Sequence, residues 1–232
     1  MAQKLWHHRG QMSEAFRTVM FLSASGGLQD AYTYIGRGKV FANAQTGNIV
    51  LMSQAAFDGN LARVLHYLVP LLSFALGVAV AEAIRIRYRE AKRLHWRQLV
   101  LVVEILLLVG VGFIPNTLDM AANALVSFAC AMQVQAFRKV HGYPFASTMC
   151  IGNLRSGMES LVVCFHLHDK KALYKALHYF GVILLFAIGA GLGAQGVAVF
   201  GNRTIWFSCA LLLVSLCFMF IQDEEQARQE TK

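Results

Sequence analysis

Six predominantly apolar stretches alternate with shorter polar stretches along the chain. They fall near residues 15–35, 64–84, 98–115, 118–137, 176–200 and 204–221. Each is close to the roughly 20 residues that an α-helix needs to cross the hydrocarbon of a bilayer. The most apolar of them, Leu99–Ile114, is interrupted only by Glu104. This pattern predicts an all-α integral membrane protein with six full spans.

Two further segments, 40–57 and 145–167, are too polar to be ordinary lipid-facing spans. If both cross the membrane, the chain has eight spans. If both are re-entrant or broken, each half has three spans and the halves are inverted relative to each other. The linker Arg85–Arg97 carries six basic residues against one acidic residue, which predicts a cytoplasmic linker. The six-span arrangement places both termini on that same side, so we favour six spans plus two polar membrane helices.

Two blocks of the sequence recur later in the chain. Residues 65–77 and 177–189 align at a constant offset of 112 (177 − 65), with seven of thirteen positions identical. An earlier block recurs at an offset of 105, and its shared residues are Ala31/Ala136, Gly47/Gly152 and Asn48/Asn153. Duplicated halves are the usual construction of membrane transporters. We therefore expect a single membrane domain over 1–232, with halves at about 15–115 and 118–221 and polar tails at 1–14 and 222–232.

The composition agrees with a membrane protein and narrows its partners. Apolar residue types make up 56% of the chain and charged types 15%, and the mean hydropathy is +0.49. Soluble domains carry about 25% charged residues. The net charge of +8 predicts contact of the linker Arg85–Arg97 with anionic lipid headgroups, and no nucleic-acid partner. A stripe of small residues at Gly189, Gly191, Gly193 and Gly196 is typical of close helix packing, and leaves a homodimer open.

The first polar segment and the helix before it also resemble a known family. The run Gly26–Tyr34, GGLQDAYTY, is followed by Val40–Asn48, VFANAQTGN. Together they resemble the YoaK family of bacterial multi-spanning membrane proteins, whose domain is of unknown function. The resemblance covers essentially the whole chain. It implies a multi-pass protein of the bacterial inner membrane and supplies no substrate.

The repeated polar segments are the candidate binding site. Thr and Asn favour helix starts and Gly permits close backbone approach, so a helix that starts near Thr46 would aim free N–H groups into the protein. The alternative is that these small residues only let helices pack closely. If the repeats are inverted, both segments converge near the midplane. The predicted substrate-binding residues are Asp30, Asn43, Thr46, Gly47 and Asn48 of the first half, and Gln135, Thr148, Gly152 and Asn153 of the second.

Three charged residues have competing interpretations. Asp30 is either a functional carboxylate, which carries a proton or faces a watery cavity, or a structural hydrogen-bond acceptor. Its equivalent in the second half is Gln135. Arg155 and Glu159 lie four residues apart, so on a helix they share a face and can pair as a gate or as a structural strut.

The function that these features favour is solute transport. Duplication, paired polar segments and a few intramembrane charges predict a secondary transporter or facilitator for a small polar or anionic solute. A structural or regulatory membrane protein is the alternative, and it predicts no water-accessible interior between the halves. The sequence has no nucleophile elbow, zincin helix or phosphate-binding loop, and we expect no enzyme activity, no cofactor and no metal site.

Overall fold

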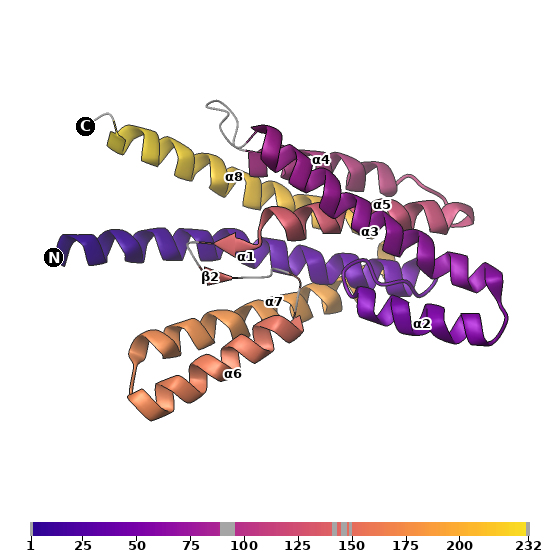
Figure 1. Cartoon of the computed structure of the whole chain (residues 1–232). Coiled ribbons are helices and arrows are strands. Elements are labelled where there is room, and N and C mark those ends of the chain that lie inside the picture. Colours follow the sequence, from indigo (N-terminus) through magenta and orange to yellow (C-terminus); the bar gives the residue numbers. More distant parts are fainter. Residues whose placement is uncertain (1, 89–95, 141–142, 145–147, 149, 231–232) are drawn as a thin grey trace.

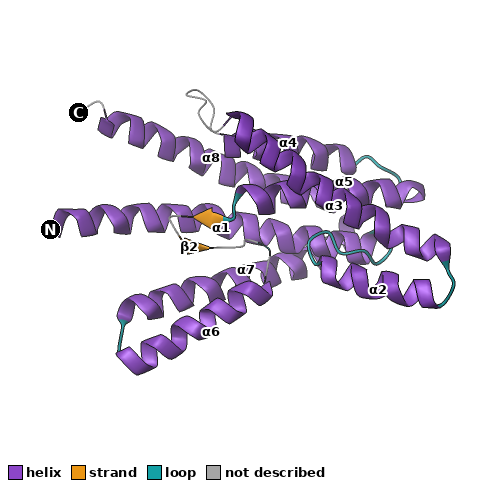
Figure 2. Cartoon of the chain, in the orientation of Figure 1, coloured by secondary structure: helices purple, strands orange, loops and turns teal. Residues whose placement is uncertain are grey.

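The computed structural model describes residues 2–88, 96–140, 143–144, 148 and 150–230, and it is almost entirely helical (Figures 1 and 2). Its α-helices are α1 Ala2–Gly36, α2 Gln45–Phe57, α3 Leu61–Tyr88, α4 Trp96–Val111, α5 Asp119–Ala136, α6 Cys150–Leu167, α7 Lys170–Phe200 and α8 Ile205–Glu230. Short 3₁₀ turns lie at Asn116–Leu118 and Gly201–Thr204, and the strands β1 Lys139–Val140 and β2 Tyr143–Pro144 pair antiparallel. The predicted helical fold class is confirmed, and all six apolar stretches are helices.

The long helices of the first half of the chain pack mainly against helices of the second half. Helix α1 lies along α7 and α8, α3 lies along α5, and α4 packs between α5 and α8. The helices α2 and α6 lie outside this bundle, α2 against α3 and α6 against α7. The start of α1 and the end of α8 lie at one end of the molecule, the end of α3 and the start of α4 lie farther inward, and the α4–α5 turn lies at the opposite end (Figure 1). Residues 89–95 of the basic linker are outside the described part.

Glycines bring the long helices into backbone contact. A Cβ atom added to Gly27 would clash with the backbone oxygen of Phe186, and one added to Gly189 would clash with that of Ala24. The same relation holds at the other crossing, where Gly77 of α3 abuts the carbonyl of Phe128 in α5. Glycine is required at these positions because any side chain would push the two helices apart.

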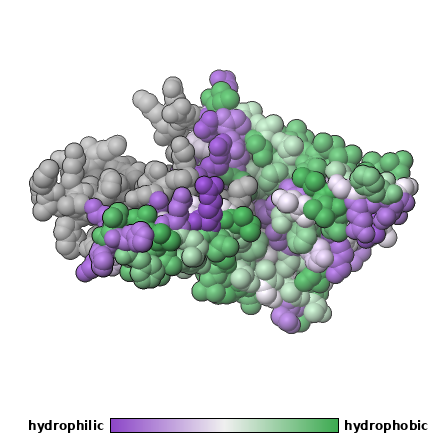
Figure 3. All heavy atoms as spheres, turned by 60° about the horizontal axis from the view of Figure 1, so that its bottom comes forward, coloured by the Kyte–Doolittle hydropathy of each residue, from purple (hydrophilic) through white to green (hydrophobic). Residues whose placement is uncertain are grey.

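Three stretches of the described chain are long and apolar enough to cross a membrane, namely Leu61–Tyr88, Asn116–Ala136 and Lys170–Phe220. Helix α4 has only 16 residues, fewer than the roughly 20 that span hydrocarbon unaided, and α1 carries polar residues at its centre. Large apolar side chains are exposed on many helices, including Leu192 and Phe165. Figure 3 shows a broad hydrophobic area with hydrophilic residues gathered mainly toward its two sides. Such a surface suits a lipid environment.

The chain re-enters the bundle after α1. Gly38 and Lys39 both adopt positive φ angles, 84° and 68°, which reverse the chain at the end of the helix. The following residues Val40 and Ala42 are fully buried. Asn43 then reaches Gly26, ten residues before the end of α1, which corresponds to a depth of about 15 Å at 1.5 Å per residue.

Candidate functional site

Asp30 fixes the segment between α1 and α2. Its carboxylate, 7% exposed, accepts the backbone N–H of Asn43 at 2.6 Å, just before α2 begins. The Asn43 side chain donates to the carbonyl oxygen of Gly26 at 3.3 Å, while its own Oδ1 is buried and has no hydrogen-bond partner. A carboxylate at the start of a helix balances the positive end of the helix dipole. The geometry therefore favours the structural interpretation of Asp30.

The Thr-Gly-Asn sequence of the first half shapes the same segment. Asn48 is fully buried and makes two hydrogen bonds to the backbone of Phe41. Its Oδ1 accepts from the Phe41 N–H at 2.9 Å, and its Nδ2 donates to the Phe41 carbonyl at 2.7 Å. Gly47 leaves room for the Phe41 ring, which stacks on Tyr34 with the ring centroids 4.4 Å apart. Thr46 is exposed. Gly47 and Asn48 therefore hold the re-entrant segment in place.

Thr148 brings the second half to the same point of α1. A Cβ atom added to Gly26 would clash with Cγ2 of Thr148 and would lie 3.8 Å from Nδ2 of Asn43. Asn43 and Thr148 are equivalent in the two halves, since 43 + 105 = 148. Thr148 is 8% exposed, and no described residue makes a hydrogen bond to its hydroxyl. Two polar oxygens, Asn43 Oδ1 and Thr148 Oγ1, are thus buried in the same region without a hydrogen-bond partner among the described residues.

The other predicted residues of the second half lie elsewhere or have different surroundings. Gln135 does not join Asp30, because its Nε2 donates to Glu82 of α3 at 2.5 Å. Asn153 is buried, as its equivalent Asn48 is, whereas Gly152 is exposed and no atom of the described residues lies within 4 Å of a Cβ atom added to it. Residues 145–147 and 149 of the second polar segment are outside the described part. The structure therefore assembles part of the predicted site, around Asn43 and Thr148.

Arg155 and Glu159 are both exposed on α6. Within the described residues, ion pairs join Arg37 to Asp119 and Arg85 to Glu82, and Arg155 does not pair with Glu159. Their predicted role as a gate or structural ion pair is therefore not seen in this conformation. The physical reason is that both side chains lie on the outer face of a peripheral helix, where no neighbour holds them together.

A buried cluster of polar side chains lies beside Asn43, and the sequence did not single it out. Its members are Ser25, Gln29, Glu104, Cys130 and Ser208, from α1, α4, α5 and α8, and we call it the interior polar cluster. Gln29 is at its centre, with Nε2 donating to Ser25 at 3.0 Å, Ser208 at 2.9 Å and Glu104 at 3.3 Å. Cys130 donates to Gln29 Oε1 and also interacts with the Asn43 side chain. The polar residues within α1 were the available indication of such a cluster.

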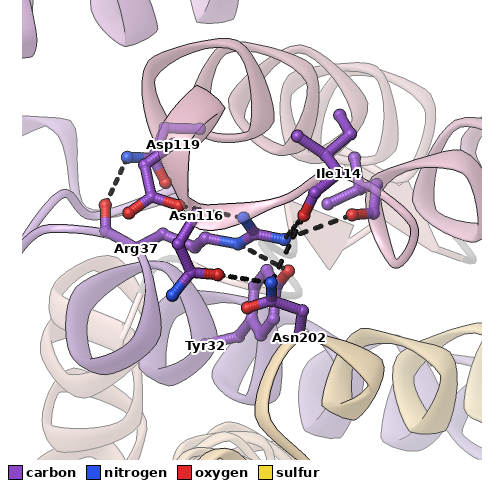
Figure 4. Close-up of polar contacts among 8 residues, drawn as sticks. Tyr32, Arg37, Ile114, Asn116, Asp119 and Asn202 are labelled. Carbon is purple, nitrogen blue, oxygen red and sulfur yellow. Dashed lines mark hydrogen bonds and ion pairs between the residues drawn. The ribbon is translucent and has the colours of Figure 1, made fainter.

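A second network of polar contacts surrounds Arg37, between the end of α1 and the α4–α5 turn (Figure 4). Arg37 at the end of α1 is fully buried and pairs with Asp119 at 2.9 Å. Its guanidinium also donates to Tyr32 Oη at 2.8 Å and to the Ile114 carbonyl at 2.8 Å. Asn202, from the turn after α7, donates to the same carbonyl at 3.3 Å. A buried cation with this many partners is well compensated, and it ties α1 to the α4–α5 turn.

Comparison with known proteins identifies a family of unknown function. No curated protein and no solved structure matches the chain. One family model, described as "Protein of unknown function (DUF1275)", matches residues 18–218. The match is consistent with the resemblance to YoaK and covers both polar segments, the interior polar cluster and the Arg37 network. The chain therefore belongs to the DUF1275 family of proteins of unknown function.

Proposed function

We propose that this protein is a secondary transporter or facilitator for a small polar or anionic solute, with its binding site between two inverted halves near the bilayer midplane. The observation that carries the proposal is the meeting of Asn43 and Thr148 at Gly26. Equivalent positions of the two halves reach one point inside the molecule, and each brings a buried oxygen without a partner. Such oxygens are costly in an apolar interior unless a ligand or water uses them.

The helix neighbours support the inverted repeat. Exchanging α1–α4 with α5–α8 turns the α1–α7 contact into α5–α3, the α2–α3 contact into α6–α7, and the α1–α8 contact into α5–α4, all of which occur. The α4–α8 contact maps onto itself. In Figure 1, α1 and α5 run in opposite directions, as do α3 and α7. Opposite directions for equivalent helices are what an inverted repeat in a membrane requires.

The same arrangement supports six spans with two re-entrant helices, α2 and α6. In Figure 1 both helices start in the interior and run outward to opposite ends of the molecule. Both chain ends then lie on the side of the basic linker, which we propose is the cytoplasmic face of a bacterial inner membrane. This topology keeps the two helix starts near the midplane, where they can face one solute.

A structural or regulatory role remains the second candidate, and the Arg37 network is the observation that favours it. That network closes one end of the molecule with a fully buried arginine. A scaffold needs such a rigid closure and no route to the interior. A transporter would have to open this end during its cycle.

Comparison of metabolite uptake tests the proposal. Cells that lack the protein are compared with cells that produce the wild type, Thr148→Val or Thr46→Val, and solutes are quantified without a target list. We expect wild type and Thr46→Val to change the level of the same small polar or anionic solute, because Thr46 is exposed. Thr148→Val should remove that change at equal protein levels. If no solute distinguishes the wild type from the deletion, the transport proposal fails.

A further inference from the structure

Glu104 is the most deeply buried acid of the described chain, and no cation among the described residues pairs with it. The side chain lies on α4 and is fully buried, as are Gln29 of α1 and Ser208 of α8. Its Oε1 accepts one hydrogen bond from the Gln29 amide at 3.3 Å, and its Oε2 has no partner. In the part of the chain that the structure describes, the ion pairs involve Arg37 and Arg85, and neither reaches Glu104.

Asp30 shows what a carboxylate receives elsewhere in the same interior. It accepts the backbone N–H of Asn43 at 2.6 Å and lies at the start of α2, where further backbone N–H groups point toward it. Donors of this kind stabilise the ionised form. Glu104 has a single, long hydrogen bond from a neutral amide, and an ionised carboxylate in such a place is strongly disfavoured. The two acids of this bundle therefore have very different hydrogen-bond partners.

We propose that Glu104 binds a proton at neutral pH and is the proton-binding residue of this protein. The proton adds to a carboxylate oxygen of Glu104 and makes the interior polar cluster neutral. The use of this proton to drive a solute rests on the transport function proposed above. The position suits that use, because Cys130 links Gln29 of the cluster to Asn43 of the candidate site.

The titratable groups around Glu104 are few. Cys130 of α5 and Cys209 of α8 are close enough to interact electrostatically with it. Asp30 of α1 lies beyond Cys130 and interacts with that same thiol. From the facing side of α1, Gln29 and Ser25 are neutral. None of these groups is a cation, so release of the proton requires water or a conformational change that exposes Glu104.

Infrared spectroscopy of the purified full-length protein tests the proposal, in a detergent that contains no ester groups. We expect the wild type at neutral pH to show the carbonyl stretch of one protonated carboxylic acid, shifted in heavy water. Glu104→Gln should lose this band. Asp30→Asn and Glu159→Gln should keep it, the latter because Glu159 is exposed on α6.

Three outcomes would overturn the proposal: no such band in the wild type, an unchanged band in Glu104→Gln, or loss of the band in Asp30→Asn instead. If Glu104→Gln does not fold, Glu104→Asp replaces it. That variant should move the band to a new frequency, and an unchanged spectrum would count against Glu104. The spectrum reports protonation directly. A band that depends on Glu104 therefore supports the proton site even if the uptake comparison finds no solute and the transport proposal fails.

Discussion

The helices α2 and α6 align in sequence, yet the residues around their starts differ in chemistry. At α2, Asp30 accepts the backbone N–H of Asn43, so the first half supplies its own anion to the helix start. The equivalent of Asp30 in the second half is Gln135, which donates to Glu82 of α3 instead. Thr148, just before α6, keeps a buried hydroxyl without a partner. The two helix starts thus differ in polar chemistry, because a carboxylate accepts from the backbone before α2, whereas a threonine hydroxyl without a partner among the described residues lies before α6.

The largest expected effect on stability comes from substitution of Arg37, because the equivalent position of the second half has no basic residue. Arg37 has Gly142 as its equivalent at an offset of 105. Arg37→Gln leaves Asp119 and the Ile114 carbonyl without their cation, and breaking a buried pair in this way costs about 3–5 kcal/mol. We expect a large drop in the thermal unfolding temperature of the detergent-solubilised protein.

The matched control for Arg37 is Arg85→Gln, since Arg85 pairs with Glu82 at an exposed position. Exposed pairs contribute about 0–1 kcal/mol, so its unfolding temperature should stay close to that of the wild type. Equal effects of the two substitutions would show that the Arg37 network is not a fixed part of the fold.

A smaller loss of stability is expected at two glycines whose contacts should be the same in the two halves. Gly77 and Gly189 are equivalent and each abuts a backbone carbonyl of a crossing helix. Gly77→Ala and Gly189→Ala should each lower stability by about 1–3 kcal/mol, the usual cost of overpacking, as measured by thermal unfolding. Gly191→Ala is the control, because no atom lies within 4 Å of its missing side chain. A large loss for one glycine and none for the other would break the symmetry of the two crossings.

The smallest stability effect concerns the two helix starts themselves. Asp30→Asn replaces a charged acceptor by a neutral one that can still accept from Asn43, so we expect a loss of about 1–2 kcal/mol. Gln135→Ala should cost roughly 0.5 kcal/mol or less, because Glu82 keeps its contact with Arg85. Thermal unfolding of the two variants side by side measures the difference. Equal losses would contradict the view that only the first half depends on its polar residue at this position.

The sequence predicted the helices well and the site only in part, for identifiable reasons. Apolar length located α1, α3, α4, α5, α7 and α8, because a helix that spans a membrane requires a nearly continuous apolar stretch. The same reasoning selected Asn43 and Thr148, which do meet at Gly26. It selected Gln135 by alignment alone, and alignment does not say which neighbour a side chain will contact.

The sequence indicated the polar residues within α1 but not the partners that complete the interior polar cluster. Its five residues lie on four helices, up to 183 positions apart between Ser25 and Ser208. Only the packing of α1 against α8 and of α4 between α5 and α8 brings them together.

Asn48 was predicted to bind a ligand, but both polar atoms of its amide make hydrogen bonds to the backbone of Phe41. Asn48 therefore stabilises the segment that contains Asn43, whose Oδ1 is buried.

The central claim, that the re-entrant segment of the first half meets the second half inside the molecule, can be tested by cross-linking in intact membranes. The five cysteines, Cys130, Cys150, Cys164, Cys209 and Cys217, all follow the basic linker. A protease site placed in that linker separates a first fragment without thiols from a second fragment that has all five. Asn43→Cys then gives the first fragment one thiol, beside Cys130. After treatment with a short bifunctional thiol reagent and cleavage, we predict that Asn43→Cys keeps the fragments joined on a denaturing gel, whereas the exposed Thr46→Cys does not. Fragments that separate in Asn43→Cys, or that stay joined to the same extent in Thr46→Cys, would contradict the shared interior site.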